Sequence, residues 1–308
     1  MRGGLSSYIF TVSTESPSIQ CTPFQTSDSI RMMNAQLPAP AAQIDPSARI
    51  DPTARIASEC VIKSGACIGA AVSLEFGVLV GANVVFVDAE PSAGTLVKRL
   101  ARIGANSSIY PGIVIAERAE VRPGSVVTRS VPPNAIVEGN PANIVGYVDA
   151  ARELHHFAPH ASGGVRQDVE ATAVKGVTVH HFPIIPDLRG NLTVCEFDKQ
   201  VPFLPKRYFM VFGVPSREIR GEHAHHRCHQ FLICLRGSCA VVADDGVRKV
   251  EIELDAPNRG LYLPPMTWGI QYKYSPDALV LVFASDYYDA ADYIRDYDQF
   301  IAEVGTKA

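Results

Sequence analysis

The first half of the chain carries an aliphatic or aromatic residue at every sixth position. A fixed short period indicates one structural unit stacked on itself. The pattern therefore predicts a parallel β-helix in which three hexads close one triangular coil, and roughly twelve hexads make about four coils. The series runs through Ile44, Ile50, Ile56, Ile62, Ile68, Leu74, Val80 and Phe86 and resumes at Ile103, Ile109, Ile115, Val121 and Val127. A second inward position, four residues further on, holds Ala48, Ala54, Cys60, Ala66, Val72, Val78 and Val84.

One interruption divides the hexads. Residues 87–102 contain Pro91 and Gly94 and are long enough to leave the coil as a loop. Loops added to a repeat scaffold often carry function. The hexad region spans residues 41–147, and its last stretch, VPPNAIVEGNPANIVGYV, is rich enough in proline to end the coil.

From Val177 the pattern changes to short alternating strands. Asp245-Gly246 is typical of a hairpin turn that needs positive φ. Many short strands with such turns predict a sandwich or barrel. The predicted strands are LTVCEF, RYFMVFGV, QFLICLRG, CAVVADDG, KVEIEL, GLYLPP and ALVLVFAS, and DAADYIRDYDQFIAEVG, which starts with an acidic cap, is predicted to be a helix.

Composition narrows the function classes. The net charge of −4 argues against general nucleic-acid binding, which usually needs a basic excess. The seven cysteines form no CxxC pair, which is typical of reduced thiols in a cytosolic protein. We find no secretory signal and no run of about 20 apolar residues that would span a membrane.

A histidine pair is the clearest chemical signal in the second half. His223 and His225 alternate in the segment RGEHAHH, so on a strand they project to the same face. Imidazoles titrate near neutral pH, so such a pair can act as base and acid on adjacent carbons. A metal cupin would also need a carboxylate and a later histidine. Cys228, His229 and Gln230 follow instead, so a metal site made from His223, His225 and His229 stays open as an alternative.

Residues 177–302 resemble the sugar 3,4-ketoisomerases, which act on dTDP-4-keto-6-deoxy-D-glucose. The segments that carry the resemblance are DLRGNLTVCEF, PFLPKRYFMVFGVPSREIRGEHAHHRCHQFLICLRGSCAVVADDG, GLYLPPMTWG and ASDYYDAADYIRDYDQF. The resemblance implies a cupin fold and a metal-independent tautomerisation, with His223 and His225 as base and acid in an order that stays open. We expect Arg220 and Arg207 to stabilise the enediolate. The other expected contacts are Arg189 with the diphosphate and Tyr208, Tyr262 or Trp268 with thymine.

The hexad region resembles the left-handed β-helix acyltransferases that N-acetylate amino groups on nucleotide-activated sugars. The hexads, TLVKRLARIGANSSIYPGIVI and VRPGSVVTRSVPPNAIVEGNPA carry this resemblance over about residues 41–147. It implies a homotrimer with acetyl-CoA in a groove between coils. The residues expected along that groove are Ala105, Ala116, Arg122, Gly139, Asn140 and Pro141, with Lys98, Arg99 or Arg102 against the CoA phosphates.

The hexad region departs from many of these relatives because it contains no histidine. A sugar amine whose pKa is lowered by burial can supply its own neutral form, and it then needs only a proton acceptor after attack. The candidates for the polar group next to the sugar amine stand at the start of the loop and are Asn83, Asp88 and Glu90. We expect Asp88 to orient the amine.

Together these features predict an all-β protein with two domains. Residues 1–40 form a disordered leader, with Met32 or Met33 as a possible true start; residues 41–147 form the left-handed β-helix; residues 148–174 form a short helix and linker; residues 175–308 form the cupin, or jelly-roll, barrel.

The predicted function is bifunctional. A PLP aminotransferase would act between the ketoisomerase and the N-acetyltransferase, in a bacterial cytoplasm. A trimeric solenoid and a dimeric cupin suggest a hexamer. Two alternatives stay open: a nucleotide-sugar sensor on an inactive trimeric scaffold, and a metallocupin epimerase or dioxygenase. Neither the configuration of the product at C4 nor the acyl group can be predicted from the sequence.

Overall fold

The structure is a computed structural model that describes residues 40–87, 94–153, 168–197 and 199–305. The described residues belong to one compact unit. The predicted leader lies outside the described residues, as do Asp88 and Glu90 of the predicted loop. Among the described residues, no helix combines the length and the apolar character that a membrane crossing requires.

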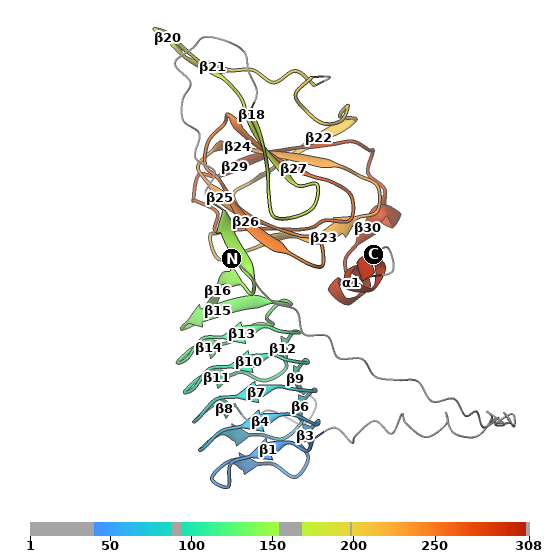
Figure 1. Ribbon diagram of the computed structural model, residues 1–308. Coiled ribbons are helices and arrows are strands. Elements are labelled where there is room, and N and C mark those ends of the chain that lie inside the picture. Colours follow the sequence, from blue (N-terminus) through green and yellow to red (C-terminus); the bar gives the residue numbers. More distant parts are fainter. Residues whose placement is uncertain (1–39, 88–93, 154–167, 198, 306–308) are drawn as a thin grey trace, which may run out of the picture. The chain divides into compact units, whose positions relative to one another are not determined.

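Residues 43–127 form a parallel β-helix, as predicted (Figure 1). Its three faces are the parallel ladders β1-β4-β7-β10-β13, β2-β5-β8-β11-β14 and β3-β6-β9-β12. Ile44 pairs with Ile62, and Ile62 with Val80, so each coil takes three hexads. The strands are β1 (Gln43–Ile44), β2 (Arg49–Ile50), β3 (Arg55–Ile56), β4 (Val61–Ile62), β5 (Cys67–Ile68), β6 (Val72–Leu74), β7 (Leu79–Val80), β8 (Val85–Phe86), β9 (Thr95–Val97), β10 (Arg102–Ile103), β11 (Ser108–Ile109), β12 (Val114–Ile115), β13 (Glu120–Val121) and β14 (Val126–Val127).

Both inward positions of the hexad build the core of the solenoid. Ile62, Val80 and Ile103 are almost fully buried, and so are the small residues Cys60 and Ala66. The turns between strands need a left-handed residue at regular intervals. Positive φ angles occur at Glu59, Gly65, Ala71, Gly77 and Asn83, and again at Leu100, Asn106, Gly112, Arg118 and Gly124.

The loop is shorter than the sequence analysis predicted. Thr95–Val97 forms β9, which pairs with β6 so that Leu74 lies opposite Val97. Val97 is fully buried because it occupies the hexad position six residues before Ile103. Lys98, Arg99 and Arg102 therefore belong to the coil and not to the excursion.

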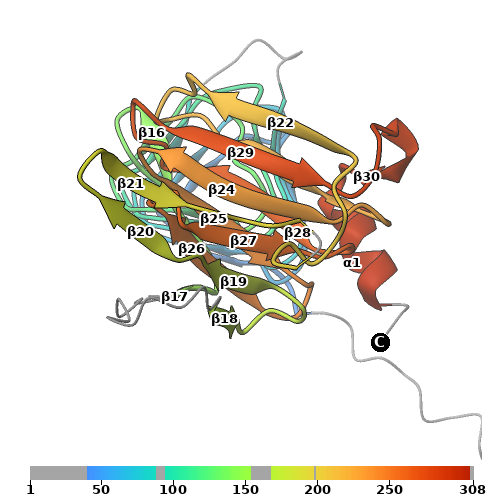
Figure 2. The ribbon, with the colours of Figure 1, turned by 90° about the horizontal axis from the view of Figure 1, so that it is seen from above.

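The second half is a double-layered, mostly antiparallel barrel, again as predicted (Figure 2). One sheet has the order β17-β26-β25-β28-β23-β30 and the other β18-β19-β27-β24-β29-β22, and β20 and β21 form a separate hairpin. The strands are β17 (Ala150–Glu153), β18 (Asp168–Ala171), β19 (Thr178–His181), β20 (Ile184–Asp187), β21 (Gly190–Thr193), β22 (Arg207–Phe212), β23 (Arg220–His225), β24 (Gln230–Arg236), β25 (Cys239–Asp244), β26 (Lys249–Leu254), β27 (Arg259–Leu263), β28 (Trp268–Tyr272), β29 (Leu279–Ala284) and β30 (Tyr293–Ile294).

Two predicted elements differ from the structure. The described residues of the expected helix and linker form β17, which pairs with β26, and β18, which pairs with β19; residues 154–167 lie outside the described residues. The C-terminal helix is shorter than predicted. Ala290–Asp292 forms a 3₁₀ helix, η1, and α1 begins only at Tyr297 and runs to Gly305. Between them β30 pairs with β23, which gives the backbone of Tyr293 and Ile294 strand partners instead of helical ones.

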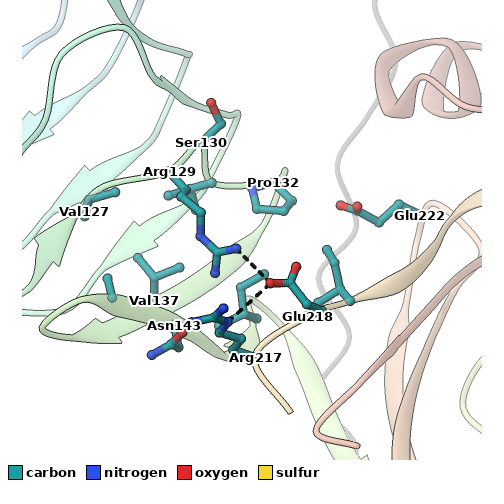
Figure 3. Close-up of a pocket in the computed structure, with 13 residues that line it drawn as sticks. Val127, Arg129, Ser130, Pro132, Val137, Asn143, Arg217, Glu218 and Glu222 are labelled. Atoms are coloured by element: carbon teal, nitrogen blue, oxygen red, sulfur yellow. Dashed lines mark hydrogen bonds and ion pairs between the residues drawn. The ribbon is translucent and has the colours of Figure 1, made fainter. Parts of the chain in front are cut away.

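The solenoid and the barrel share a core. After β14 the chain forms β15 (Ala135–Gly139) and β16 (Ala142–Tyr147), an antiparallel pair that closes the β1 ladder. The ring of Tyr147 packs edge-on against Tyr272 of the barrel at 5.3 Å. On the surface, Arg129 forms an ion pair with Glu218 at 3.0 Å (Figure 3). The end of the solenoid is thus held to β28 and to the segment that leads into β23, the strand of the histidine pair.

Candidate active site in the barrel

A bulge in β23 sets the direction of the two histidines. Gly221 and Glu222 both have positive φ, 88° and 52°, and the register with β28 shifts between Gly221 and His223. A Cβ atom on Gly221 would lie 2.5 Å from the carbonyl oxygen of Gly269, so only glycine fits there. With this geometry the imidazoles of His223 and His225 meet edge-on, with ring centroids 5.0 Å apart.

His225 is held by protein groups at both ring nitrogens. Its Nδ1 lies 3.0 Å from Oδ2 of Asp292, and its Nε2 lies 3.0 Å from Nε2 of Gln230. The carboxylate is an acceptor and fixes the hydrogen on Nδ1. Burial lowers the pKa of His225 to about 4; the nearby His223 lowers it further, while Asp292 raises it. His225 is therefore a neutral imidazole at neutral pH.

Asp292 supplies the carboxylate that the sequence around the histidines lacks. Its oxygens accept hydrogen bonds from the backbone N–H groups of Arg227 and Cys228, at 2.9 and 3.2 Å, as well as from His225. The residue is 5% exposed and ends η1, directly before the β30 strand. Sequence analysis missed it because this segment was expected to be a continuous helix.

His223 keeps one ring nitrogen available. Its Nδ1 lies 2.9 Å from the carbonyl oxygen of Gly221, to which it donates, so the lone pair of the imidazole is on Nε2. Burial lowers the pKa of His223, the hydrogen bond to Gly221 opposes this, and the charge of Arg295 lowers the pKa further. The ring of Tyr293 lies against both imidazoles, at 4.9 and 4.3 Å between centroids. Tyr293 was not among the predicted site residues.

The two predicted arginines differ in position. The charge of Arg207 acts on His225 and lowers its pKa, and its Nε donates to the carbonyl oxygen of Asp286 at 2.9 Å. The charge of Arg220 instead acts on the phenol of Tyr274, and its side chain is exposed at the start of β23. The cations that act on the imidazole pair are therefore those of Arg207 and Arg295.

The residues predicted to contact the nucleotide are not brought together in one place. Arg189 is exposed in the turn between β20 and β21, and Tyr208 is 64% exposed on β22. The Tyr262 hydroxyl lies 2.6 Å from Nδ1 of His229, and the two rings stack. The predicted contact of Trp268 with thymine stays a prediction that its position does not favour: its side chain is 4% exposed, and its ring packs against Tyr297 and Phe300 in the core.

A metal-ligand geometry occurs at the same place. Among the described residues, His225, Cys228 and Asp292 offer ligand atoms that all lie within 4.8 Å of one another. The same carboxylate already accepts three N–H hydrogen bonds. These bonds account for its position next to His225 without further partners. The metal ligands considered from the sequence were His223, His225 and His229. They are not assembled, because the imidazole of His229 forms a hydrogen bond with the Tyr262 hydroxyl.

The predicted acetyl-CoA residues lie on the later coils. Lys98 forms an ion pair with Asp298 of α1 at 3.4 Å, and Arg99 binds Glu117 at 2.7 Å. Arg102 is exposed on β10. The remaining members also lie at the surface or against a neighbouring coil: Arg122 binds Glu120 at 3.1 Å, Ala105 accepts from the N–H of Gly124, Ala116 is 7% exposed, and Gly139 and Asn140 are exposed. Asn83, a candidate at the sugar amine, donates to Asn106 at 3.2 Å.

The fold and the site define a cupin-type barrel with a buried pair of imidazoles suited to proton transfer. The chain belongs to the family of sugar 3,4-oxoisomerases. The FdtA family model, described as WxcM-like, C-terminal, matches residues 175–305. The chain is 47% identical over 122 residues, which are 40% of its length, to the TDP-4-oxo-6-deoxy-α-D-glucose-3,4-oxoisomerase of Aneurinibacillus thermoaerophilus, and it covers 88% of that protein.

Another curated protein matches a short part of the chain. It is the dTDP-3-amino-3,6-dideoxy-α-D-galactopyranose 3-N-acetyltransferase of Aneurinibacillus thermoaerophilus, 57% identical over 54 residues, which are 18% of this chain and 28% of that protein. Among solved structures, the 3,4-ketoisomerase QdtA of Thermoanaerobacterium thermosaccharolyticum in complex with TDP is 36% identical. It has a TM-score of 0.43 and matches 44% of this chain and 98% of its own.

Proposed function

We propose that the barrel isomerises dTDP-4-keto-6-deoxy-D-glucose to a dTDP-3-keto-6-deoxyhexose. The observation that carries this proposal is the pair of neutral imidazoles at 5.0 Å, in a family whose members include a 3,4-oxoisomerase. Two proton acceptors one strand step apart match the two neighbouring carbons that exchange hydrogen.

The reaction begins when one imidazole removes the hydrogen on C3 as a proton. The electron pair forms a C3=C4 double bond, and the C4 carbonyl oxygen becomes an enediolate oxygen. An imidazolium then protonates carbon C4, and the proton of the C3 hydroxyl moves to the C4 oxygen, which gives the C3 ketone and a C4 hydroxyl. The proton count balances, because one proton leaves carbon and one returns.

Three side chains support these transfers. Asp292 and Gln230 hold the ring of His225, and the buried carboxylate stabilises the imidazolium when it forms. Arg207, whose charge acts on His225, supplies positive charge for the enediolate oxygen. Arg220 remains the proposed second hydrogen-bond donor to the enediolate, for a substrate that reaches the start of β23. Arg189 remains the proposed contact of the diphosphate, and Tyr208 or Tyr262 that of thymine.

Product analysis tests the isomerase directly. The protein is incubated with dTDP-4-keto-6-deoxy-D-glucose, and proton NMR follows the ring signals. Conversion to the 3-keto isomer supports the proposal. Tight binding without conversion would instead favour the alternative of a nucleotide-sugar sensor on an inactive scaffold.

We also propose that the solenoid acetylates a dTDP-3-amino-3,6-dideoxyhexose with acetyl-CoA. The chain spans 28% of the length of the N-acetyltransferase that it resembles, and the β-helix supplies the coil-to-coil grooves that such chemistry uses. Lys98, Arg99 and Arg102 are the proposed phosphate contacts, and Asp88 the residue that orients the amine. Consumption of acetyl-CoA only when the 3-aminosugar is present, and its selective loss in Asp88→Ala, are the expected results; unchanged turnover in that variant would contradict the role of Asp88.

The two proposed activities need a third between them. A 3-ketosugar becomes a 3-aminosugar only by transfer of an amino group, so a PLP aminotransferase is the proposed partner. We place all three in a bacterial cytoplasm, and we propose a hexamer of trimeric solenoids and dimeric barrels. Exposed apolar residues on β22, the edge strand of its sheet, support a second barrel docking there: Tyr208, Met210 and Phe212 are 64%, 48% and 67% exposed.

A further inference from the structure

A polar cavity lies away from the histidine pair. It encloses about 400 Å³ between the late coils of the solenoid, the turn from β25 to β26 and helix α1. Volumes in this range, about 300–1,000 Å³, are typical of small-molecule sites. Arg118, Lys249 and Arg248 line it, together with Asn134 and Tyr297.

Lys249 is the central cation of this cavity. Its side chain is 13% exposed, and its Nζ lies 3.7 Å from Oδ2 of Asp244, which is beyond hydrogen-bond distance. The ammonium lies 5.9 Å from the ring centroid of Tyr297. An ammonium group has three hydrogens to donate, and this one forms a long ion pair with Asp244, which leaves hydrogens for further acceptors. It therefore remains able to bind an anion.

Arg118 brings a second positive charge close to the first. It stands in the turn before β13 with a φ of 55°, and its charge helps to lower the pKa of Lys249, after the larger effect of burial. Its single ion pair, to Asp149 at 2.5 Å, leaves most of its five N–H donors available. Two cations from different parts of the chain thus face one space.

Three acidic residues line the cavity, Glu117, Asp149 and Asp244, and each has a partner; that of Asp149 is Arg118. The two oxygens of Asp244 accept from the backbone N–H of Gly246 at 2.7 Å and from the hydroxyl of Tyr297 at 2.6 Å. Glu117 binds Arg99 at 2.7 Å, and burial raises its pKa. The lining therefore has spare donors and few spare acceptors.

A smaller cavity next to the segment before β23 contrasts with this one. It encloses about 210 Å³, and its arginines, Arg129 and Arg217, both turn to Glu218, at 3.0 and 3.5 Å (Figure 3). In the smaller cavity both cations share one carboxylate, whereas Lys249 lies 3.7 Å from its acidic partner in the larger one. Glu222, which also lines the smaller cavity, adds a further negative group.

We propose that the larger cavity binds a small anion with a phosphate or diphosphate group, held by Lys249 and Arg118. Arg248, at the rim, and the Asn134 amide offer further donors. The site is separate from the imidazole pair, so its ligand would act as an effector or a second bound nucleotide rather than as the substrate of isomerisation.

Calorimetric titration of the full chain with inorganic pyrophosphate tests this site. Lys249→Gln and Arg118→Gln should each weaken binding about ten-fold, because a charge-assisted hydrogen bond is lost. Arg129→Gln removes an equivalent charge from the smaller cavity and should leave binding within about two-fold. Isomerisation should persist in all three variants, since none of these residues touches the histidine pair.

Each outcome decides the proposal. Loss of binding in both variants with intact isomerisation supports it. Failure of pyrophosphate to bind the unaltered protein, or equal binding in the unaltered protein and both variants, would overturn it. If Lys249→Gln does not fold, as judged by circular dichroism, the exposed Arg118→Gln decides alone. Titration with dTDP and with adenosine 3′,5′-bisphosphate then distinguishes a nucleotide-sugar source from a CoA source.

Discussion

The Nδ1 atom of His225 lies 3.0 Å from Oδ2 of Asp292, although 67 residues separate the two in the chain. The pairing depends on β30, which places the end of η1 beside β23. Both side chains are almost fully buried, so the hydrogen bond lies in a medium where it is stronger than in water. Asp292 thus orients His225 without itself reaching the substrate in our proposal.

Asp292→Asn tests this positioning role. The amide keeps the size of the side chain but removes the charge that stabilises the imidazolium. We expect kcat for isomerisation to fall about 100-fold or more, with KM changed less than about three-fold. Asp298→Asn, an exposed change in the same C-terminal segment, is the control and should leave isomerisation unchanged. Equal activity of both variants would show that Asp292 is only structural.

The order of the two proton transfers can be separated by variants of the pair. His223→Asn and His225→Asn should each reduce isomerisation by about 10²- to 10⁴-fold, the range for loss of one general acid or base. Acetyl transfer by the solenoid should be unaffected in both. The variant that still exchanges the C3 hydrogen with solvent has lost the acid, and the variant that does not has lost the base. Full isomerisation in either one would remove that histidine from the mechanism.

Stability should depend on pH through the buried imidazoles. The pKa of His225 is lowered from 6.5 to about 4 in the folded protein by burial. Between these values the unfolded chain binds a proton that the folded chain does not, so the free energy of unfolding falls as pH falls from about 6.5 to 4. The slope should be on the order of 1 kcal/mol per pH unit. Urea titrations at several pH values measure it, and His225→Asn should flatten the curve; an unchanged slope in that variant would contradict the assignment.

Because Trp268 is buried, we expect it to stabilise the fold and not to stack on the thymine of the substrate. Trp268→Phe leaves space next to Tyr297 and Phe300, so we expect a loss of about 1–3 kcal/mol in unfolding free energy. KM for the nucleotide sugar should stay within about two-fold. A large rise in KM with unchanged thermal stability would restore Trp268 to the nucleotide site.

The sequence was sufficient to predict the β-helix and the barrel because the hexad period and the strand alternation are both local patterns. Hexad spacing alone predicts the stacked coils, and counting back six residues from Ile103 would have found Val97 and the true end of the loop. Alternation alone places His223 and His225 together, although the bulge at Glu222 could not be seen from the pattern. These features depend on neighbours within a few residues.

The rest of the site depends on contacts between distant segments. Asp292 and Tyr293 reach the histidines only because β30 interrupts what resembles one helix, and no local signal in DAADYIRDY marks that strand. The indole of Trp268 lies on β28, which pairs with the strand of the histidines, but the aromatic rings of α1 cover it. Propensity and spacing do not report which surface a helix will cover.

The central claim is that two imidazoles move the proton between C3 and C4 without a metal ion. Incubation with dTDP-4-keto-6-deoxy-D-glucose in deuterated water, with and without a strong chelator, tests it most directly. Our account predicts that deuterium enters the sugar at the same rate in both samples. Exchange that stops with the chelator and returns when a divalent metal is added would contradict it.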